Sequence, residues 1–192
     1  MARTMRITAE TLPLIAARAR GGRVVVFDTE TTGGAPWDEI CQIAAAEYVG
    51  GRLGRTLALY VRPTCRMNPW AQAVHGLSMS FLRENGIAPE EAMERFFRFV
   101  GDGALLVAHN APFDLRMLRQ ECCKFGLCHE PCGIETCDTV VLSRRLRPDL
   151  PNHRLATMVE ALRIPAAATH DALDDTLACA GVFFRLLEDA VS

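Results

Sequence analysis

Two carboxylates separated by one residue, Asp28 and Glu30, follow a short apolar run near the start of the chain. The run, Val24 to Phe27, is rich in β-branched side chains, which predicts a buried strand. In an extended backbone, residues i and i+2 project to the same side, so both carboxylates face one way. Buried acids repel each other unless a cation lies between them, and hard oxygen ligands suit Mg²⁺ or Mn²⁺. The pattern indicates a metal site; solvated acids at a strand end are the alternative.

Three groups further along the chain have the types needed for the same chemistry. Asp114 is expected on the first turn of a helix that follows a buried strand over 104–108. His170 and Asp175 flank the start of the last expected helix, so Asp175 is about one turn along it. Taken singly, an acid near a helix N-terminus is typical of a surface position, and a lone histidine of a structural one.

The five groups together have a shared chemical logic. Four carboxylates are enough to hold two divalent cations about 4 Å apart, the arrangement that clamps attacking and leaving oxygens in phosphoryl transfer. A nearby imidazole can take a proton from water because its pKa lies near neutrality. The combination therefore predicts a two-metal site, with Mg²⁺ or Mn²⁺ as the cations, and a histidine base.

Periodicity and turn residues predict the elements that position these groups. Strands are expected from Val24, over Ile40 to Val49, over Leu53 to Arg62 and over Ala104 to Ala108. Helices are expected over Thr11 to Arg20, Pro69 to Val74, Ser78 to Glu84, Pro89 to Val100, Pro112 to Phe125, Thr139 to Leu146, Arg154 to Leu162 and Asp171 to Asp189. Because Gly50-Gly51 favours a hairpin, the first three strands should form an antiparallel meander. The order of elements predicts an α/β layer with a mixed sheet.

Composition limits the classes of protein that fit. The 192 residues, 49% of them hydrophobic, suit a single domain spanning 1–192. No apolar run approaches the roughly 20 residues that cross a bilayer, and the first six residues do not resemble a signal peptide. The net charge of −2 excludes a generally polyanion-binding surface. Nucleic-acid contact would need a local basic patch, for which four arginines are candidates: Arg144, Arg145, Arg147 and Arg154.

The chain has eight cysteines, five of which fall between Cys122 and Cys137 together with His129. A zinc site there is conceivable, but the spacing lacks the paired C-x₂-C knuckles typical of such sites. Several thiols without a signal peptide favour reduced side chains in a cytoplasmic protein. We therefore expect a cytoplasmic location and no structural zinc.

Three segments resemble the three motifs of the DEDDh family of DnaQ-like exonucleases, especially the proofreading epsilon subunit of bacterial DNA polymerase III and its relatives. The segments are Asp28-Thr29-Glu30-Thr31-Thr32-Gly33, His109-Asn110-Ala111-Pro112-Phe113-Asp114 and His170-Asp171-Ala172-Leu173-Asp174-Asp175. Three further segments resemble lesser signatures of the family: Val74-His75-Gly76-Leu77-Ser78, Cys137-Asp138-Thr139 and Asn152-His153-Arg154-Leu155. The resemblance covers roughly 23–187, and all three motifs in order are far more specific than any one.

The resemblance implies a ribonuclease-H-like fold, with a mixed five-stranded sheet flanked by helices. It implies 3′→5′ hydrolysis of single-stranded nucleic-acid ends, DNA favoured, with release of nucleoside 5′-monophosphates. The implied metal ligands are Asp28, Glu30, Asp114 and Asp175, and His170 is the implied general base. The implied substrate contacts are Thr31, Thr32, His75, Asn110 and Phe113. Asp174 is left out of the site because the family's spacing from the motif histidine selects Asp175 instead. Asp138 is left out because it matches a family position that is usually structural.

Other functions remain open at this stage. The same chemistry fits an exoribonuclease, or a DNA-trimming nuclease within a larger complex, and a polymerase or another nucleic-acid-processing complex is a candidate partner. A membrane is not expected as a partner. A non-catalytic nucleic-acid-binding module on the same fold would have lost at least one acid or the histidine, and all five are present.

Overall fold

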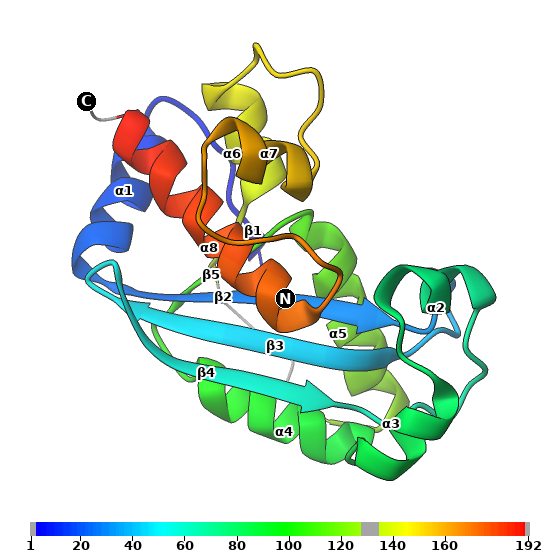
Figure 1. The fold of residues 1–192 in the computed structure, drawn as a ribbon. Coiled ribbons are helices and arrows are strands. Elements are labelled where there is room, and N and C mark those ends of the chain that lie inside the picture. The colour runs from blue at the N-terminus through cyan, green and yellow to red at the C-terminus, as the bar shows by residue number, and fades with distance from the viewer. Residues whose placement is uncertain (1–2, 128–134, 191–192) are drawn as a thin grey trace.

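The computed structural model describes residues 3–127 and 135–190. Its strands are β1 (Arg3–Thr4), β2 (Arg23–Thr31), β3 (Ile40–Val49), β4 (Arg52–Tyr60), β5 (Leu105–Ala108) and β6 (Glu135–Asp138). Its helices are α1 (Thr11–Gly21), α2 (Pro69–His75), α3 (Met79–Asn85), α4 (Pro89–Val100), α5 (Ala111–Lys124), α6 (Thr139–Leu146), α7 (Leu155–Ala161) and α8 (Ala172–Asp189). The predicted helices are therefore present, with ends that shift by a few residues at most. Figure 1 shows α8 across one face of the sheet and α4 on the other.

The described strands form one mixed sheet in the order β1-β6-β5-β2-β3-β4. β2, β3 and β4 pair antiparallel as the predicted meander, and β3 turns into β4 through Gly50 and Gly51, whose φ angles are 58° and 75°. β5 is parallel to β2, and β6 to β5. The predicted mixed sheet is confirmed, and among the described residues the two-residue β1 adds a sixth strand to the five that were expected. β6 and the two-residue β1 had no strand pattern of their own in the sequence, and they exist by pairing with each other and with β5.

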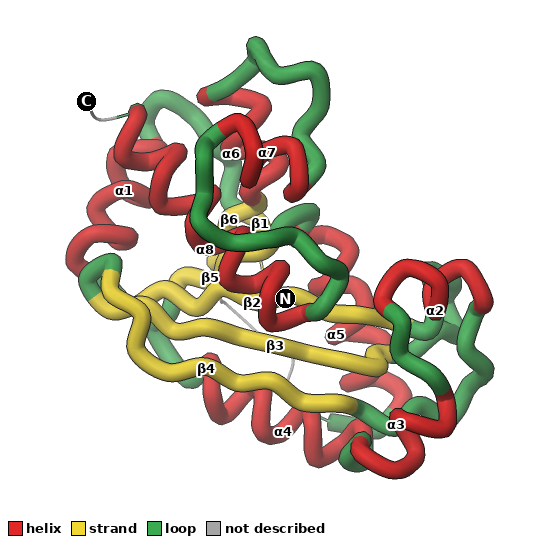
Figure 2. The backbone as a smooth tube through the Cα atoms, viewed as in Figure 1, coloured by secondary structure: helices red, strands yellow, loops and turns green. Residues whose placement is uncertain are grey.

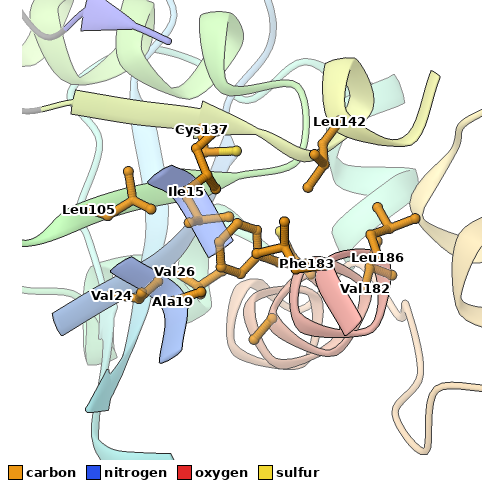
Figure 3. Close-up of a cluster of buried hydrophobic side chains, with 14 of the residues drawn as sticks. Ile15, Ala19, Val24, Val26, Leu105, Cys137, Leu142, Val182, Phe183 and Leu186 are labelled. Atoms are coloured by element: carbon orange, nitrogen blue, oxygen red, sulfur yellow. The ribbon is translucent and has the colours of Figure 1, made fainter. Parts of the chain in front are cut away.

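The alternating side chains of β2 separate two hydrophobic cores. Val24 and Val26 face α1, α6, α7 and α8, where Phe183 of α8 is fully buried (Figure 3). Val25 and Phe27 face α4 and α5, where Phe27 and Phe96 place their ring centroids 5.5 Å apart. A strand buried on both faces reads as a continuous apolar run, which is why the pattern before Asp28 marks the centre of the sheet.

The carboxyl ends of β2, β5 and β6 meet at one edge of the sheet, and three helices begin near it (Figure 2). α5 starts directly after β5 with Pro112 in its first turn, and α6 starts directly after β6 with Asp138 as its cap. Asp171 caps α8, accepting from the backbone N–H groups of Leu173 and Asp174. Helix starts and strand ends thus converge on one place.

The expected lack of a membrane span and the zinc alternative both concern features that the described residues cover to different extents. No helix among the described residues is long and apolar enough to cross a membrane. The zinc alternative rests partly on Cys128, His129 and Cys132, which lie outside the described residues.

Candidate active site

Asp28 and Glu30 lie on β2, facing the same side as the alternation predicts. Asp28 pairs with Ala44 of β3 and Glu30 with Gln42, and the ladder shifts register directly after Glu30. Burial raises the pKa of Asp28 well above its usual range, and the charges of Asp114, Glu30 and Asp175 raise it further. Burial and the charges of Asp175, Asp114 and Asp171 raise the pKa of Glu30 to about 8. The two side chains are therefore part of one crowded acidic cluster.

Asp114 reaches this cluster from the first turn of α5. Its carboxylate oxygen Oδ1 accepts from the backbone N–H of Thr29 at 3.2 Å and from the Thr29 hydroxyl at 2.7 Å. Burial raises the pKa of Asp114 to about 7, although the bonds from Thr29 act in the opposite direction. Thr29, the residue between the two β2 acids, therefore fixes a third carboxylate beside them.

Asp175 and His170 arrive together from α8 and the loop before it. Asp175 Oδ1 accepts from the backbone N–H groups of Thr169 at 2.8 Å and His170 at 3.3 Å. The imidazole Nδ1 of His170 lies 4.0 Å from Asp175 Oδ2, and the His170 side chain is 60% exposed. Ligand atoms of Glu30, His170 and Asp175 lie within 4.8 Å of one another. His170 has a φ of 60°, which costs free energy in a non-glycine residue and needs such anchoring.

The charge balance of the cluster suits bound cations. Within residues 3–127 and 135–190, no carboxylate among Asp28, Glu30, Asp114 and Asp175 forms an ion pair with a lysine or an arginine. All four have raised pKa values, with burial as the largest cause. Asp114 and Asp175 are buried, and Asp28 and Glu30 are half-buried. An all-oxygen donor set of this kind, without a basic partner, fits hard divalent cations.

Gln42 is a site residue that the sequence analysis missed. Its amide nitrogen donates to Asp171 Oδ2 at 2.7 Å, and its oxygen accepts from the backbone N–H of Ala172 at 3.1 Å. The side chain is almost fully buried, so it ties β3 to the start of α8 directly beside His170. The available signal was a single polar residue within the apolar run that begins β3. Gln42 lies opposite Glu30 in the ladder.

The acidic cluster lies between two cavities. One, of about 700 Å³, is lined by Asp28, His109, Asn110, Val140, Arg144, Asn152, His153, Arg154, Leu155, Ala156, Ala168, His170 and Asp175. The other, of about 350 Å³, is lined by Thr29, Glu30, Thr31, Gly33, Gly34, Asn68, Trp70, Ala71, Val74, His75 and Phe113. The structure therefore brings four of the five predicted substrate contacts to the cavities that adjoin the acids: Thr31, His75, Asn110 and Phe113.

Thr32, the fifth predicted contact, does not join them. Its side chain is fully buried, its hydroxyl accepts from the backbone N–H of Glu39 at 2.9 Å, and its own N–H donates to the Glu39 carbonyl at 2.8 Å. The ladder between β2 and β3 shifts register between Glu30 and Thr31, so the strict alternation of faces along β2 does not extend to Thr32. The geometry leaves Thr32 a structural role.

The arginines considered as phosphate contacts divide in the same way. Arg144 and Arg154 line the larger cavity, whereas Arg147 is engaged in a bidentate pair with Asp149 at 2.9 Å. Asp138 accepts from the backbone N–H groups of Val140 and Asn110, as expected for a structural residue. Arg145 is exposed but lines neither cavity.

A family model described as Exonuclease, RNase_T, matches residues 25–183. The chain belongs to this exonuclease family. The match includes every acid of the cluster and His170, and it confirms the resemblance to DnaQ-like exonucleases that the motifs predicted.

Curated relatives of this exonuclease are longer proteins. It is 41% identical over 169 residues to the DNA polymerase III subunit epsilon-like protein of Rhodobacter capsulatus, a match that covers 85% of this chain and 23% of that protein. It is 34% identical over 168 residues to the DNA polymerase III PolC-type protein of Caldanaerobacter subterraneus subsp. tengcongensis. That match covers 87% of this chain and 12% of that protein. The 3′-5′ exonuclease DinG of Bacillus subtilis is 33% identical over 168 residues, a match that covers 86% of this chain and 18% of that protein.

Solved structures confirm the ribonuclease-H-like α/β fold of the exonuclease. E. coli Exonuclease I in complex with a dA16 oligonucleotide superposes with a TM-score of 0.74 at 21% identity, covering 86% of this chain and 42% of that one. Exonuclease X in complex with 5′ overhanging duplex DNA gives a TM-score of 0.69 at 23% identity, covering 88% and 93%.

Proposed function

We propose that this chain is a metal-dependent 3′→5′ exonuclease domain, spanning residues 1–192, which removes nucleoside 5′-monophosphates from single-stranded ends. The observation that carries the proposal is the convergence of four acids, two buried and two half-buried, all with raised pKa values, at the motif positions of an exonuclease family. Such a cluster is unfavourable for a structural purpose alone, because its members repel one another.

The residues that would hold the metal are Asp28, Glu30, Asp114 and Asp175, and two Mg²⁺ or Mn²⁺ ions are the proposed cofactors. Bound there, divalent cations neutralise charge that develops on the phosphate oxygens and lower the pKa of water. A form of E. coli Exonuclease I carries a zinc ion, so another divalent metal is a further candidate for this chain. The buried hydrogen bonds between Thr29 and Asp114 hold Asp114 beside Asp28 and Glu30, the two acids that flank Thr29, before any cation binds.

His170 is the proposed general base. Its side chain is exposed and lines the larger cavity, while its backbone is held by the carboxylate of Asp175. It is therefore positioned to accept the proton of a water that attacks the terminal phosphodiester. Lining of the adjoining cavities supports Thr31, His75, Asn110 and Phe113 as contacts to the terminal nucleotide.

DNA is the favoured substrate and a polymerase-containing complex the favoured setting, because several relatives are named for DNA polymerase III. Proofreading, replication and repair are the corresponding roles, and a cytoplasmic location remains a prediction. An exoribonuclease, or a trimming nuclease within another complex, keeps the same chemistry and differs in substrate. A non-catalytic nucleic-acid-binding module would not retain the full acidic cluster.

The test is degradation of single-stranded DNA and RNA labelled at the 3′ or the 5′ end, with Mg²⁺, with Mn²⁺ and with EDTA. We expect mononucleotides from the 3′ end, faster on DNA, and no product in EDTA. Asp175→Ala should be inactive and serves as the control for contaminating nucleases. Cleavage of a strand whose 3′ end is blocked, or undiminished cleavage in EDTA, would overturn the proposal.

A further inference from the structure

The short helix α2 stands beside the acidic cluster and separates two hollows. Trp70, Val74 and His75 line the cavity that contains Glu30. On its other side, Gln72 lines a cavity of about 560 Å³ together with residues of the β4–α2 segment and of α3. Figure 1 shows α2 and α3 beyond the carboxyl end of β2, so a strand leaving the acidic cluster in that direction meets α2 first.

Trp70 presents an aromatic face on the side of α2 that faces the cluster. It is 84% exposed, and Val74, one turn further along, is 52% exposed. The backbone around Trp70 is well held, because the Asn68 side chain accepts from the Trp70 N–H at 2.9 Å. An indole that packs against almost nothing, on a capped helix beside the acids, has the form of a binding surface.

The second cavity is lined by a group of arginines without acids. Arg62, Arg66 and Arg83 are all exposed, and the lining contains no Asp or Glu. Within residues 3–127 and 135–190, none of the three is ion-paired with a carboxylate, although Arg62 donates to the Gly86 carbonyl at 3.1 Å. The chain as a whole has a net charge of −2, so this patch is a local excess of positive charge.

We propose that α2 carries a binding surface for the part of a single strand that lies upstream of the reacting 3′ end. Trp70 stacks on an unpaired base, and Arg66 and Arg83 contact phosphates further along the strand. The inference rests on the proposed function and extends it from the reacting nucleotide to its neighbours. A single strand is the fitting partner, because it offers free base faces and phosphates together, whereas a duplex hides its base faces.

The two tryptophans of the chain allow a direct binding test. Trp37, 74% exposed, lines neither of the two cavities beside α2, so it is a matched control for Trp70. Trp37→Phe and Trp70→Phe are each made in an Asp175→Ala background, so that the strand stays intact. An octanucleotide of deoxythymidine is added, and its saturation is followed independently by the anisotropy of a terminal label.

We expect indole fluorescence to be quenched at saturation in the Trp37→Phe protein, whose remaining indole is Trp70, and to stay unchanged in the Trp70→Phe protein. Equal quenching in both, or quenching only in the protein that retains Trp37, would overturn the proposal. Because no turnover is measured, these outcomes are separate from a failure of the proposed exonuclease activity. That failure would appear as an inactive protein with intact binding.

Kinetics supply the second measurement. Trp70→Ala should lower kcat/KM on the octanucleotide by about tenfold, the order of one lost base–aromatic stack. The loss on the p-nitrophenyl ester of thymidine 5′-monophosphate should be much smaller, since that substrate has no upstream base. Arg66→Gln and Arg83→Gln should each make the salt dependence of octanucleotide binding shallower by about one phosphate contact, whereas Arg52→Gln, at the β3–β4 hairpin, should not.

Three outcomes of the kinetic and binding measurements would contradict the proposed binding surface on α2. The first is an equal loss on the ester and the octanucleotide, which would place Trp70 at the reacting nucleotide. The second is an unchanged salt slope in both arginine variants. The third is competition by a blunt duplex as effective as that by the single strand, which would show that free bases are not recognised.

Discussion

The carboxylate of Asp28 is crowded by four other acids, Asp171 among them, and each of them makes its ionised form less favourable. Burial is the largest cause, followed by the charge of Asp114. Hydrogen bonds from Thr29 lower the pKa of Asp114 and so partly offset the effect of its burial. Hydrogen bonds from the backbone before α8 do the same for Asp175. At neutral pH the cluster therefore lowers the free energy of unfolding of the metal-free chain, and bound cations offset that loss.

Asp28→Asn should stabilise the metal-free chain and abolish its activity. A folded-state pKa above the unfolded value means that the ionised group costs stability once the pH exceeds about 4. Removing it should raise the free energy of unfolding in EDTA, because the folded variant no longer holds an ionised carboxylate beside the other acids. Urea unfolding in EDTA and the rise of Tm with added Mg²⁺ provide the measurement. A variant that is less stable in EDTA, or that keeps the wild-type response to Mg²⁺, would refute the assignment.

Gln42 should act on turnover through His170 as a positioning residue, by holding Asp171. Gln42→Ala removes both bonds to the start of α8, and we expect kcat to fall about tenfold. The exchange Gln42→Glu with Asp171→Asn reverses the donor and the acceptor while keeping every bond and the net charge, so it should restore most of the rate. In a His170→Gln background, itself expected to lose about 10²–10⁴ in kcat, Gln42→Ala should cause little further loss.

Two readouts separate this role from simple stabilisation. Additive losses of kcat in the double variant would mean that Gln42 acts independently of His170. An exchange that restores Tm without restoring kcat would mean that the bonds matter for folding alone.

At the scale of elements, α5 is tied to the sheet at two points. In its first turn, Asp114 accepts a hydrogen bond from the backbone N–H of Thr29 in β2. Two turns later, Glu121 accepts from the backbone N–H of Ile40, where β3 begins, at 2.7 Å. The other oxygen of Glu121 is buried and has no hydrogen-bond partner among the described residues. Burial raises the pKa of Glu121 to about 7, and the charge of Glu90 adds to the effect.

Glu121 should make stability fall as the pH rises. Its folded-state pKa is above its usual value of 4.5, so the folded chain binds the proton more tightly, and the free energy of unfolding decreases between about pH 4.5 and 7. Glu121→Gln removes this contribution, of about 3 kcal/mol at most, while keeping an acceptor for Ile40. Urea unfolding at pH 5 and at pH 8 should show a smaller difference for the variant than for the wild type. Glu94→Gln, at an exposed position of α4, is the surface control, and an identical pH dependence in Glu121→Gln and wild type would contradict the prediction.

At the scale of the whole molecule, the cavities beside the acids and beyond α2 contain only a few of the described arginines. The net charge is −2, and the arginines facing the proposed strand path are Arg144 and Arg154 in the larger cavity, with Arg66 and Arg83 beyond α2. Four contacts to phosphates release few counterions. Binding of a single strand should therefore depend only moderately on salt.

The expected slope of log K against log salt concentration is about −3, from roughly 0.7 per phosphate neutralised on a single strand. Anisotropy titrations of a labelled single strand between low and moderate salt measure it. Arg52→Gln is again the control that should not change it. A slope steeper than about −5 would require basic surface that these four arginines do not provide.

Local signals in the sequence were sufficient for the elements and for the identity of the acids. The apolar run before Asp28 is a central strand because both its faces are buried, and Pro112 and Asp171 mark helix starts by their backbone chemistry. The spacing of Asp28 and Glu30 implies a shared face because strand geometry has a period of two. These inferences need only neighbouring residues, so a single chain contains them.

Only the tertiary structure decided which distant groups meet and what each is free to do. Strands β1 and β6 exist through pairing with partners far along the chain, and the bond between Gln42 and Asp171 joins residues 129 positions apart. Thr31 and Arg144 line the cavities beside the acids, whereas Thr32 and Arg147 line neither cavity and are bonded to Glu39 and Asp149. Trp70, by contrast, is left exposed beside the acids. Burial and hydrogen-bond partners come from packing across the whole chain, and no local pattern encodes them.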